Sequence, residues 1–143
     1  MTIEQVQNEI VDDFSILEGD REATIFYIME LGQKLPNFPE EYRVEENLIK
    51  GCMSKVWLHT QFDNGVIRFL ADSNTEITKG LISLLIRVLD GRSPQEILNA
   101  DLVFIGKIGM SGLIGSQRSN GFTSMIKQMK LYALAYQSKV NAN

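Results

Sequence analysis

From Val56 to Ala71 the chain reads VWLHTQFDNGVIRFLA, and this stretch decides the fold. Its two halves, Val56 to Phe62 and Val66 to Ala71, are rich in the β-branched and aromatic residues that favour strands. Between them lies Asp63-Asn64-Gly65, in which Asn-Gly accepts the positive φ angles of a tight turn. The stretch therefore predicts an antiparallel hairpin, which a short strand around Leu48-Ile49 would extend to three strands.

Helical patterns lie on both sides of this hairpin. Apolar residues at three- and four-residue steps predict a first helix from about Thr2 to Leu17, and Asp20 can cap a second helix that ends near Leu35. Helices are also predicted after the hairpin, over Thr75 to Asp90, from Ser93-Pro94, and along the chain that follows Phe122. The predicted fold is α+β: a small antiparallel sheet of two to three strands packed against several helices, in a single domain spanning residues 1–143.

The composition is that of an ordinary globular domain. Of the 143 residues, 44% are hydrophobic and 22% are charged, which is enough for one core without a disulfide or metal. The N-terminus lacks the pattern of a signal peptide, and the longest apolar patch, Leu81 to Leu89, is interrupted and too short to span a bilayer. We expect a soluble cytoplasmic protein with no membrane partner.

The charge is unevenly distributed along the chain. Residues 1–46 carry twelve acidic side chains against three basic ones, whereas residues 47–143 carry six acidic against eleven basic. The net charge of -4 argues against a nucleic-acid partner. Two interpretations stay open: the acidic segment folds against the basic remainder, or one of these surfaces docks a partner.

Cys52 is the single cysteine of the chain. One cysteine excludes an internal disulfide, a multi-cysteine zinc site and an iron–sulfur cluster held by this chain alone. Gly51 allows a sharp turn, and the nearby Lys50 and Lys55 favour the thiolate, which is the nucleophilic form. Because a lone cysteine is commonly a small buried hydrophobic residue, the local sequence leaves a reactive and a structural role equally open.

Other candidate motifs are weaker. His59 is the only histidine, and an inert position on a strand is favoured over a role as base for Cys52. Trp57 is expected to anchor the core of the sheet. Four glycines recur at every third residue from Gly106 to Gly115, but they match neither the phosphate-loop nor the dinucleotide pattern, which favours close packing or a bent helix.

The segment Gly51-Cys52-x-Ser54-x-Val56-Trp57 resembles the signature around the reactive cysteine of the SufE family. Three further segments resemble that family in the same order, and together the four extend over about Ile25 to Leu134. They are Leu31-Gly32-x-x-Leu35-Pro36, Asp72-Ser73 with Ile77-x-Lys79-Gly80-Leu81, and Arg118-Ser119-Asn120-Gly121-Phe122 with Met125-Ile126. One departure is Gly115-Ser116, where the family favours a small hydroxyl residue followed by proline.

The resemblance implies a SufE/IscU-like fold and a role as sulfur acceptor. Cys52 would receive persulfide sulfur from a SufS-type cysteine desulfurase, activate that enzyme by unloading it, and pass the sulfur to a SufBCD-type iron–sulfur cluster scaffold. Pyridoxal phosphate belongs to the desulfurase, so this chain is expected to need no cofactor or metal and to have no small-molecule active site of its own. A homodimer is left open.

The resemblance also assigns roles around Cys52. Gly51, Met53 and Ser54 would shape the cysteine loop, and Asp72 and Arg118 would lie near this loop or at the partner surface. We expect Cys52 to be partly sheltered at rest and turned outward by the desulfurase. The alternatives are an independent cysteine-nucleophile enzyme, such as a thiol hydrolase that uses His59 as its base, and an interaction adaptor in which Cys52 is structural.

Overall fold

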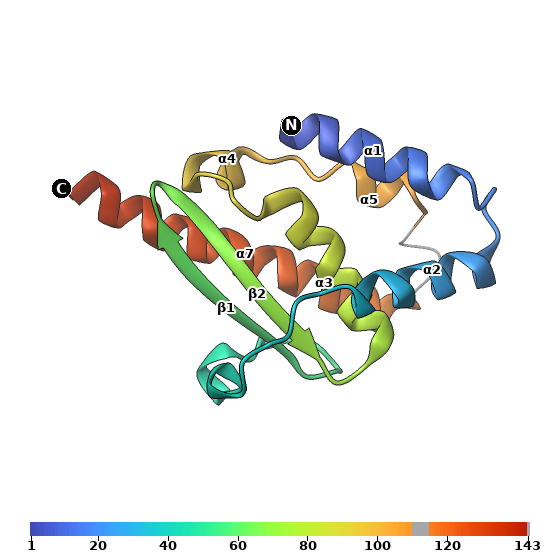
Figure 1. The fold of residues 1–143 in the computed structure, drawn as a ribbon, viewed down its shortest axis with the longest axis horizontal. Coiled ribbons are helices and arrows are strands. Elements are labelled where there is room, and N and C mark those ends of the chain that lie inside the picture. Colours follow the sequence, from blue (N-terminus) through green and yellow to red (C-terminus); the bar gives the residue numbers. More distant parts are fainter. Residues whose placement is uncertain (110–114, 143) are drawn as a thin grey trace.

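The computed structural model describes residues 1–109 and 115–142, with side chains at 1–109 and 121–141 (Figure 1). Helices α1 and α2 precede a β-hairpin, and in the described residues α3, α4, α5 and α7 follow it. The elements are α1 (Ile3–Ser15), α2 (Arg21–Gln33), the short 3-10 helices η1 (Glu40–Tyr42) and η2 (Glu45–Asn47), β1 (Val56–Asp63), β2 (Val66–Ser73), α3 (Glu76–Leu89), α4 (Pro94–Asn99), α5 (Phe104–Lys107) and α7 (Gly115–Ala142). The predicted α+β class is confirmed.

The hairpin forms as predicted. Strands β1 and β2 pair antiparallel from Val56 opposite Ser73 to Asp63 opposite Val66. Asn64 and Gly65 turn the chain with φ angles of +53° and +80°, the combination that suits a two-residue hairpin turn. The expected third strand is reduced to an isolated bridge between Leu48 and Trp57, so the sheet of the described residues has two strands.

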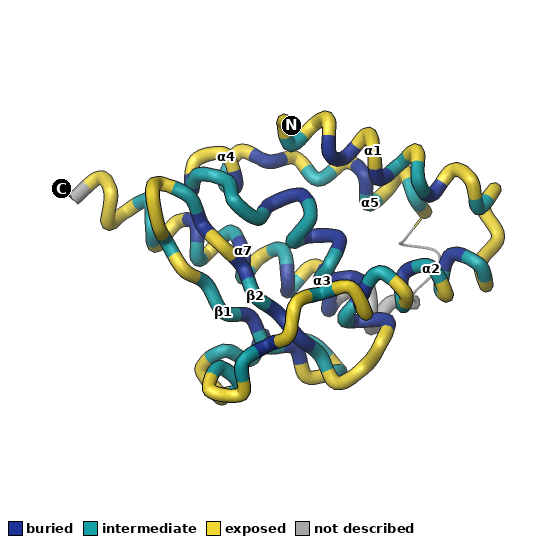
Figure 2. Tube along the Cα trace, in the orientation of Figure 1, coloured by how far each residue is buried: buried dark blue, intermediate teal, exposed yellow. Residues whose placement is uncertain are grey.

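Helix α3 lies at the centre of the domain and packs against β2, α1, α2 and α7. Nine of its residues are buried, which agrees with the strongly apolar sequence of this segment. Alternate residues of the hairpin, including Leu58 and Phe69, are buried in the same core. Figure 2 shows this burial concentrated where the sheet and helices meet, with exposed residues along the outer helices and loops.

Helices α2 and α3 approach each other closely at two glycines. A Cβ atom on Gly32 would lie 2.6 Å from the backbone nitrogen of Gly80. A Cβ atom on Gly80 would lie 2.6 Å from the carbonyl carbon of Ile28 and closer still to its oxygen. Both positions therefore require glycine, because any side chain would push the two helix backbones apart.

The helix boundaries follow capping signals in the sequence. Thr2 and Ser93 each form a capping box with the residue three positions later, and Asp20 accepts a hydrogen bond from the backbone of Ala23 at 2.9 Å. The last helix, however, begins at Gly115 rather than near Phe122. In the described residues, no helix is long and apolar enough to cross a membrane.

Two weaker predictions concern Trp57 and the glycine series. Trp57 is half-buried and lies beside Arg43, with the guanidinium 5.3 Å from the ring centroid, so the expectation of a core anchor is wrong. In the glycine series, a Cβ atom on Gly106 or Gly109 would meet nothing within 4 Å, so the expectation of close packing is wrong at these two positions. Gly106 lies in α5, Gly109 has a φ of +74°, and Gly112 lies outside the described residues.

Candidate functional site

Cys52 lies in a narrow loop, residues 50–55, that leads into β1. The backbone N–H of Ile49 donates to the carbonyl oxygen of Val56 at 2.9 Å, which closes the base of the loop. Gly51 has a φ of +90°, a left-handed conformation that glycine adopts without steric cost. The loop tip is open to solvent, since the side chain of Met53 is 77% exposed. The cysteine is thus held next to an exposed turn.

The sulfur of Cys52 faces helix α7. Its thiol donates to the carbonyl oxygen of Gly121, with a distance of 3.5 Å from Sγ to oxygen. A Cβ atom on Gly121 would lie 3.7 Å from Sγ, so the missing side chain leaves space beside the sulfur.

That space is a small pocket of about 20 Å³. It is lined by Cys52 and six other residues: Met53, Ser54, Thr78, Leu81, Gly121 and Met125. A cavity needs roughly 10–15 Å³ to hold one water molecule, so this pocket has room for about one atom of that size.

Burial sets the ionisation of the resting thiol. Desolvation in the half-buried position raises the pKa of Cys52 above its ordinary value, because the charged thiolate is disfavoured away from water. The expectation that Lys50 and Lys55 favour the thiolate is therefore wrong for this resting conformation. Both lysines are exposed, and burial is the cause that prevails. At neutral pH the sheltered sulfur is a protonated thiol.

The second half of the loop is fastened to the junction between β2 and α3. The hydroxyls of Thr75 and Thr78 donate to Ser54 Oγ at 3.0 and 3.3 Å. Lys55 donates from its backbone to Asn74 Oδ1 at 3.0 Å, and the backbone N–H of Asn74 donates back to the carbonyl of Lys55 at 3.2 Å. Sequence reasoning singled out Ser54 but missed the residues that fasten the loop, which are Asn74, Thr75 and Thr78. Their only signal is the small polar residues that follow β2.

Asp72 lies at the centre of an ion-pair cluster. Its carboxylate is buried and pairs with Arg43 and, at 3.3 Å, with Lys79. Burial alone would raise the pKa of Asp72, but hydrogen bonds from Arg43, the Ser73 backbone and Lys79 together hold this pKa below its usual value.

Arg43 links this carboxylate to the connection between α2 and β1. Its guanidinium lies 5.3 Å from the ring centroids of both Phe38 and Trp57. Arg43 was not anticipated from the sequence. Asp72 is not among the described residues that line the Cys52 pocket. Through its ion pair with Arg43, it holds the connection that precedes the cysteine loop.

His59 is not part of the described surroundings of Cys52. Arg118 belongs to α7, one turn before Gly121, but its side chain lies outside the described residues. The ring of His59 stacks on Tyr42, with the centroids 3.6 Å apart, and is not among the described residues of the Cys52 pocket. Across the described parts of the chain, no three histidine, cysteine, aspartate or glutamate residues are grouped to hold a metal ion.

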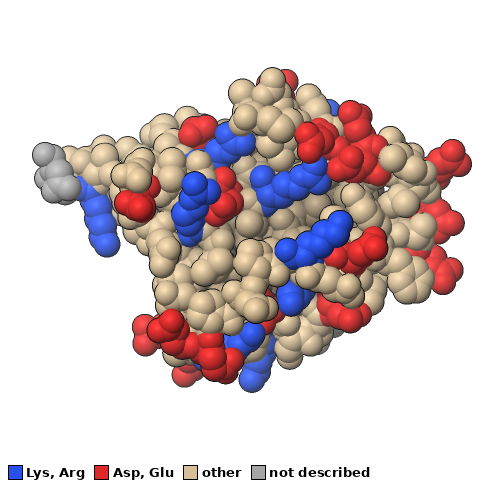
Figure 3. Space-filling model, in the orientation of Figure 1, with Lys and Arg blue, Asp and Glu red and all other residues tan. Residues whose placement is uncertain are grey.

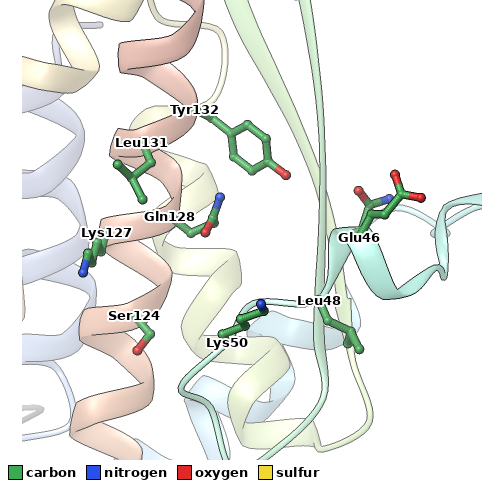
Figure 4. A pocket seen from close by; sticks show the side chains of 9 residues that line it. Glu46, Leu48, Lys50, Ser124, Lys127, Gln128, Leu131 and Tyr132 are labelled. Carbon is green, nitrogen blue, oxygen red and sulfur yellow. The ribbon is translucent and has the colours of Figure 1, made fainter.

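A larger hollow, of about 420 Å³, lies between α7 and the segment that leads into the loop (Figure 4). In Figure 4, Gln128 and Tyr132 point from α7 toward the segment carrying Leu48 and Lys50. Lys127 and Lys50 bring positive charge to its lining, and Ser124 lies close to Gly51. This hollow adjoins the cysteine loop at Lys50 and shares no lining residue with the small pocket.

Fold and site together define a class: an α+β domain whose lone thiol is carried on a loop beside a pocket of atomic size. The chain belongs to the SufE family, because residues 8–133 match the family model described as the SufE Fe-S metabolism associated domain. This assignment confirms the resemblance carried by the four sequence segments, and it connects the chain with iron–sulfur metabolism.

Curated relatives and a solved structure agree with this membership. The chain is 37% identical over 128 residues to an uncharacterized SufE-like protein of Rhizobium meliloti, covering 86% of this chain and 91% of the relative. It is 40% identical over 128 residues to one of Rhizobium etli, covering 86% of each chain. A solution structure of a hypothetical protein from Thermus thermophilus superposes with a TM-score of 0.75 at 18% identity, covering 93% of this chain and 96% of that one, which shows the shared fold.

Proposed function

We propose that this protein is a sulfur carrier, in which Cys52 accepts persulfide sulfur from a cysteine desulfurase and delivers it to iron–sulfur cluster assembly. The observation that carries the proposal is the setting of the thiol: it lies in a loop with an exposed tip and adjoins a pocket of about 20 Å³. Such a pocket can receive one additional sulfur atom. Family membership supports the same role.

The transfer is an exchange between thiols that needs no oxidant or reductant. The Cys52 thiolate attacks the outer sulfur of a persulfide on the desulfurase, and a bond forms between Sγ and that sulfur. The bond between the outer sulfur and the desulfurase cysteine breaks, and that cysteine leaves as a thiolate. The proton of the Cys52 thiol passes to solvent before the attack. Delivery to a recipient thiol repeats the same step in the opposite role.

One cysteine is sufficient for this chemistry, and a second would interfere with it. A neighbouring thiol can attack a persulfide, form a disulfide and release the sulfur. The chain contains no second cysteine, so a persulfide on Cys52 has no intramolecular thiol to resolve it.

The resting loop favours storage over attack. Burial raises the pKa of Cys52, and a protonated thiol is a poor nucleophile. Attack therefore requires the loop to release Ser54 from Thr75 and Thr78 and to carry the sulfur away from Gly121. We assign this release to docking of the desulfurase, for which exposed Met53 is an accessible first contact.

The docking face is assigned to the surface around the loop. Met53 is exposed at the loop tip, and Lys50 and Lys127 line the adjoining hollow, so this surface presents both apolar and positively charged groups. A SufS-type desulfurase is the proposed donor and a SufBCD-type scaffold the proposed recipient. The pyridoxal phosphate stays with the donor.

The test is to measure the intact mass of the chain after incubation with a SufS-type cysteine desulfurase and L-cysteine. We expect a mass gain of one or more sulfur atoms that a reductant removes. Cys52→Ser should abolish the gain, whereas His59→Ala should leave it unchanged because His59 stacks on Tyr42. No gain on the parent chain, or an equal gain on Cys52→Ser, would contradict the proposal.

A further inference from the structure

The connection between α1 and α2 exposes apolar side chains that the core does not use. Ile16 is 79% exposed and Phe26 is 61% exposed. Phe26 borders a hollow of about 560 Å³ together with half-buried Leu17 and Met29, and Ile16 is the neighbour of Leu17 in the chain. We call these four residues, with the carboxylates Glu18, Glu22 and Glu30 of the same segment, the α1–α2 surface. Residues 16–34 carry four acidic and two basic side chains, so this segment is acidic overall. Large apolar side chains grouped on a surface commonly mark an interaction site.

The carboxylates of this surface are not used in the ion pairs that join the described elements. In the acidic N-terminal segment, Glu9 and Asp13 pair with Arg87 at 2.6 and 3.2 Å. Glu18, Glu22 and Glu30 are exposed and form none of the described ion pairs. The acidic segment thus folds against the basic remainder only in part.

The acidic charge is visible at one end of the molecule. Figure 3 shows acidic side chains gathered at the end where α1 and α2 meet, around uncharged surface. An apolar centre with an acidic rim is complementary to a partner that has apolar side chains flanked by positive charge.

One face of α2 forms a wall of the hollow. Its α2 lining includes Ala23, Phe26, Glu30 and Gln33, which recur at three- and four-residue steps along one face. Ten residues of helix extend over about 15 Å, which matches about three turns of a partner helix lying alongside.

We propose that the α1–α2 surface binds a positively charged amphipathic helix of a partner protein. A second copy of this chain would bring the same acidic rim against itself, and an anionic membrane or a nucleic acid would be repelled. The described residues that line this hollow are different from those that line the Cys52 pocket, so the two sites share no side chain. The proposal goes beyond sulfur transfer and does not depend on it.

The test uses the full chain and a synthetic amphipathic peptide, with leucine on one helical face and lysine on the other. We expect binding in the micromolar range by calorimetry, with NMR shifts at residues 16–33. A scrambled peptide of the same composition and a version with glutamate in place of lysine should each bind at least tenfold more weakly.

Matched variants separate docking from general charge attraction. Phe26→Ser should weaken binding of the amphipathic peptide at least tenfold, whereas Leu134→Ser, at a position 51% exposed on α7, should leave it unchanged. Glu22→Gln with Glu30→Gln should reduce both the affinity and its salt dependence. Circular dichroism checks that each variant is folded.

Three results would overturn the proposal: shifts outside residues 16–33, equal effects of Phe26→Ser and Leu134→Ser, or concentration-dependent dimerisation that Phe26→Ser abolishes. The last result would assign the surface to a second copy. Sulfur uptake by Cys52 is measured on the same variants and should be unchanged by Phe26→Ser. Failure of the docking proposal and failure of the carrier proposal are therefore separate outcomes.

Discussion

The cysteine loop and the α1–α2 surface differ in what they expose. The loop turns its reactive atom inward, where Gly121 accepts the thiol hydrogen and burial keeps the sulfur protonated. The α1–α2 surface has no nucleophile and presents Ile16 and Phe26 to solvent. A thiol that must react only within one complex benefits from burial away from other reactants. A surface that binds a partner must be exposed to solvent before the partner arrives. The two regions therefore suit different and independent events: docking of a helix at one, exchange of sulfur at the other.

Both regions pack against α3: the Cys52 pocket through Thr78 and Leu81, and the α1–α2 surface through α2. Of the variants considered, Gly80→Ala should therefore cause the largest loss of stability. The new Cβ would overlap the carbonyl group of Ile28 and force α2 away from α3. We expect a loss of about 3 kcal/mol in the free energy of unfolding, measured by urea denaturation. The matched control is Gly106→Ala, where a Cβ meets nothing within 4 Å and stability should be nearly unchanged. Equal stability of the two variants would contradict the close α2–α3 contact.

Asp72→Asn should destabilise the ion-pair cluster that precedes the cysteine loop, with a smaller loss of stability than Gly80→Ala. It removes the charge from a buried acceptor and leaves Arg43 and Lys79 with a weaker partner. We expect a loss of about 2 kcal/mol at pH 7. The control is Asp63→Asn, at an exposed position beside the hairpin turn, which should have little effect.

The pH dependence of that loss has a defined sign. Because the folded-state pKa of Asp72 is lowered, its stabilisation is complete above the unfolded value of about 3.9 and disappears as pH falls through the folded value. Urea denaturation at pH 7 and pH 3 should show the parent chain and Asp72→Asn converging at the lower pH. A difference that stays constant would show that the charge is not responsible.

Ser54→Ala should have the smallest effect on stability and act on the loop alone. It removes the acceptor for Thr75 and Thr78, so the loop should open more often. At about 1 kcal/mol for the lost contacts, Cys52 alkylation by iodoacetamide should become about fivefold faster at neutral pH. Ser83→Ala is the control, because the Ser83 hydroxyl donates to Gly80 within α3 at 2.6 Å, away from the loop.

The pH profile of the same alkylation sharpens this test. In the parent chain its midpoint should lie above the ordinary thiol pKa of about 8.5, since burial raises the pKa of Cys52. In Ser54→Ala the midpoint should move down toward that ordinary value. Identical rates and midpoints in Ser54→Ala and Ser83→Ala would mean that these hydroxyl contacts do not hold the loop.

Local sequence patterns were sufficient to predict most of the secondary structure of the described residues. Asn64-Gly65 specified the hairpin because turn chemistry is a property of adjacent residues, and Asp20 and Ser93 marked helix starts for the same reason. The apolar period did not locate the start of α7, because residues 115–121 are polar or glycine and show no such period.

The site was less predictable, because its chemistry depends on distant residues. Gly121, which accepts the thiol hydrogen, lies 69 positions from Cys52. The partners of Ser54 lie 21 and 24 positions away. The nearby lysines suggested a lowered pKa, but the raised pKa of Cys52 follows from burial that only the folded chain creates. The family segments located the cysteine correctly without revealing how it is sheltered.

The contact between Gly32 and Gly80 joins two of the segments that carried the family resemblance, and it affects how the molecule opens. With backbone against backbone, α2 cannot separate from α3 without exposing the core around Ile28, which is fully buried. The two helices should form one cooperative unit in hydrogen exchange. Amides of α2 near Ile28 would then exchange only through global unfolding, whereas those of the cysteine loop would exchange through local opening that leaves the rest of the domain intact.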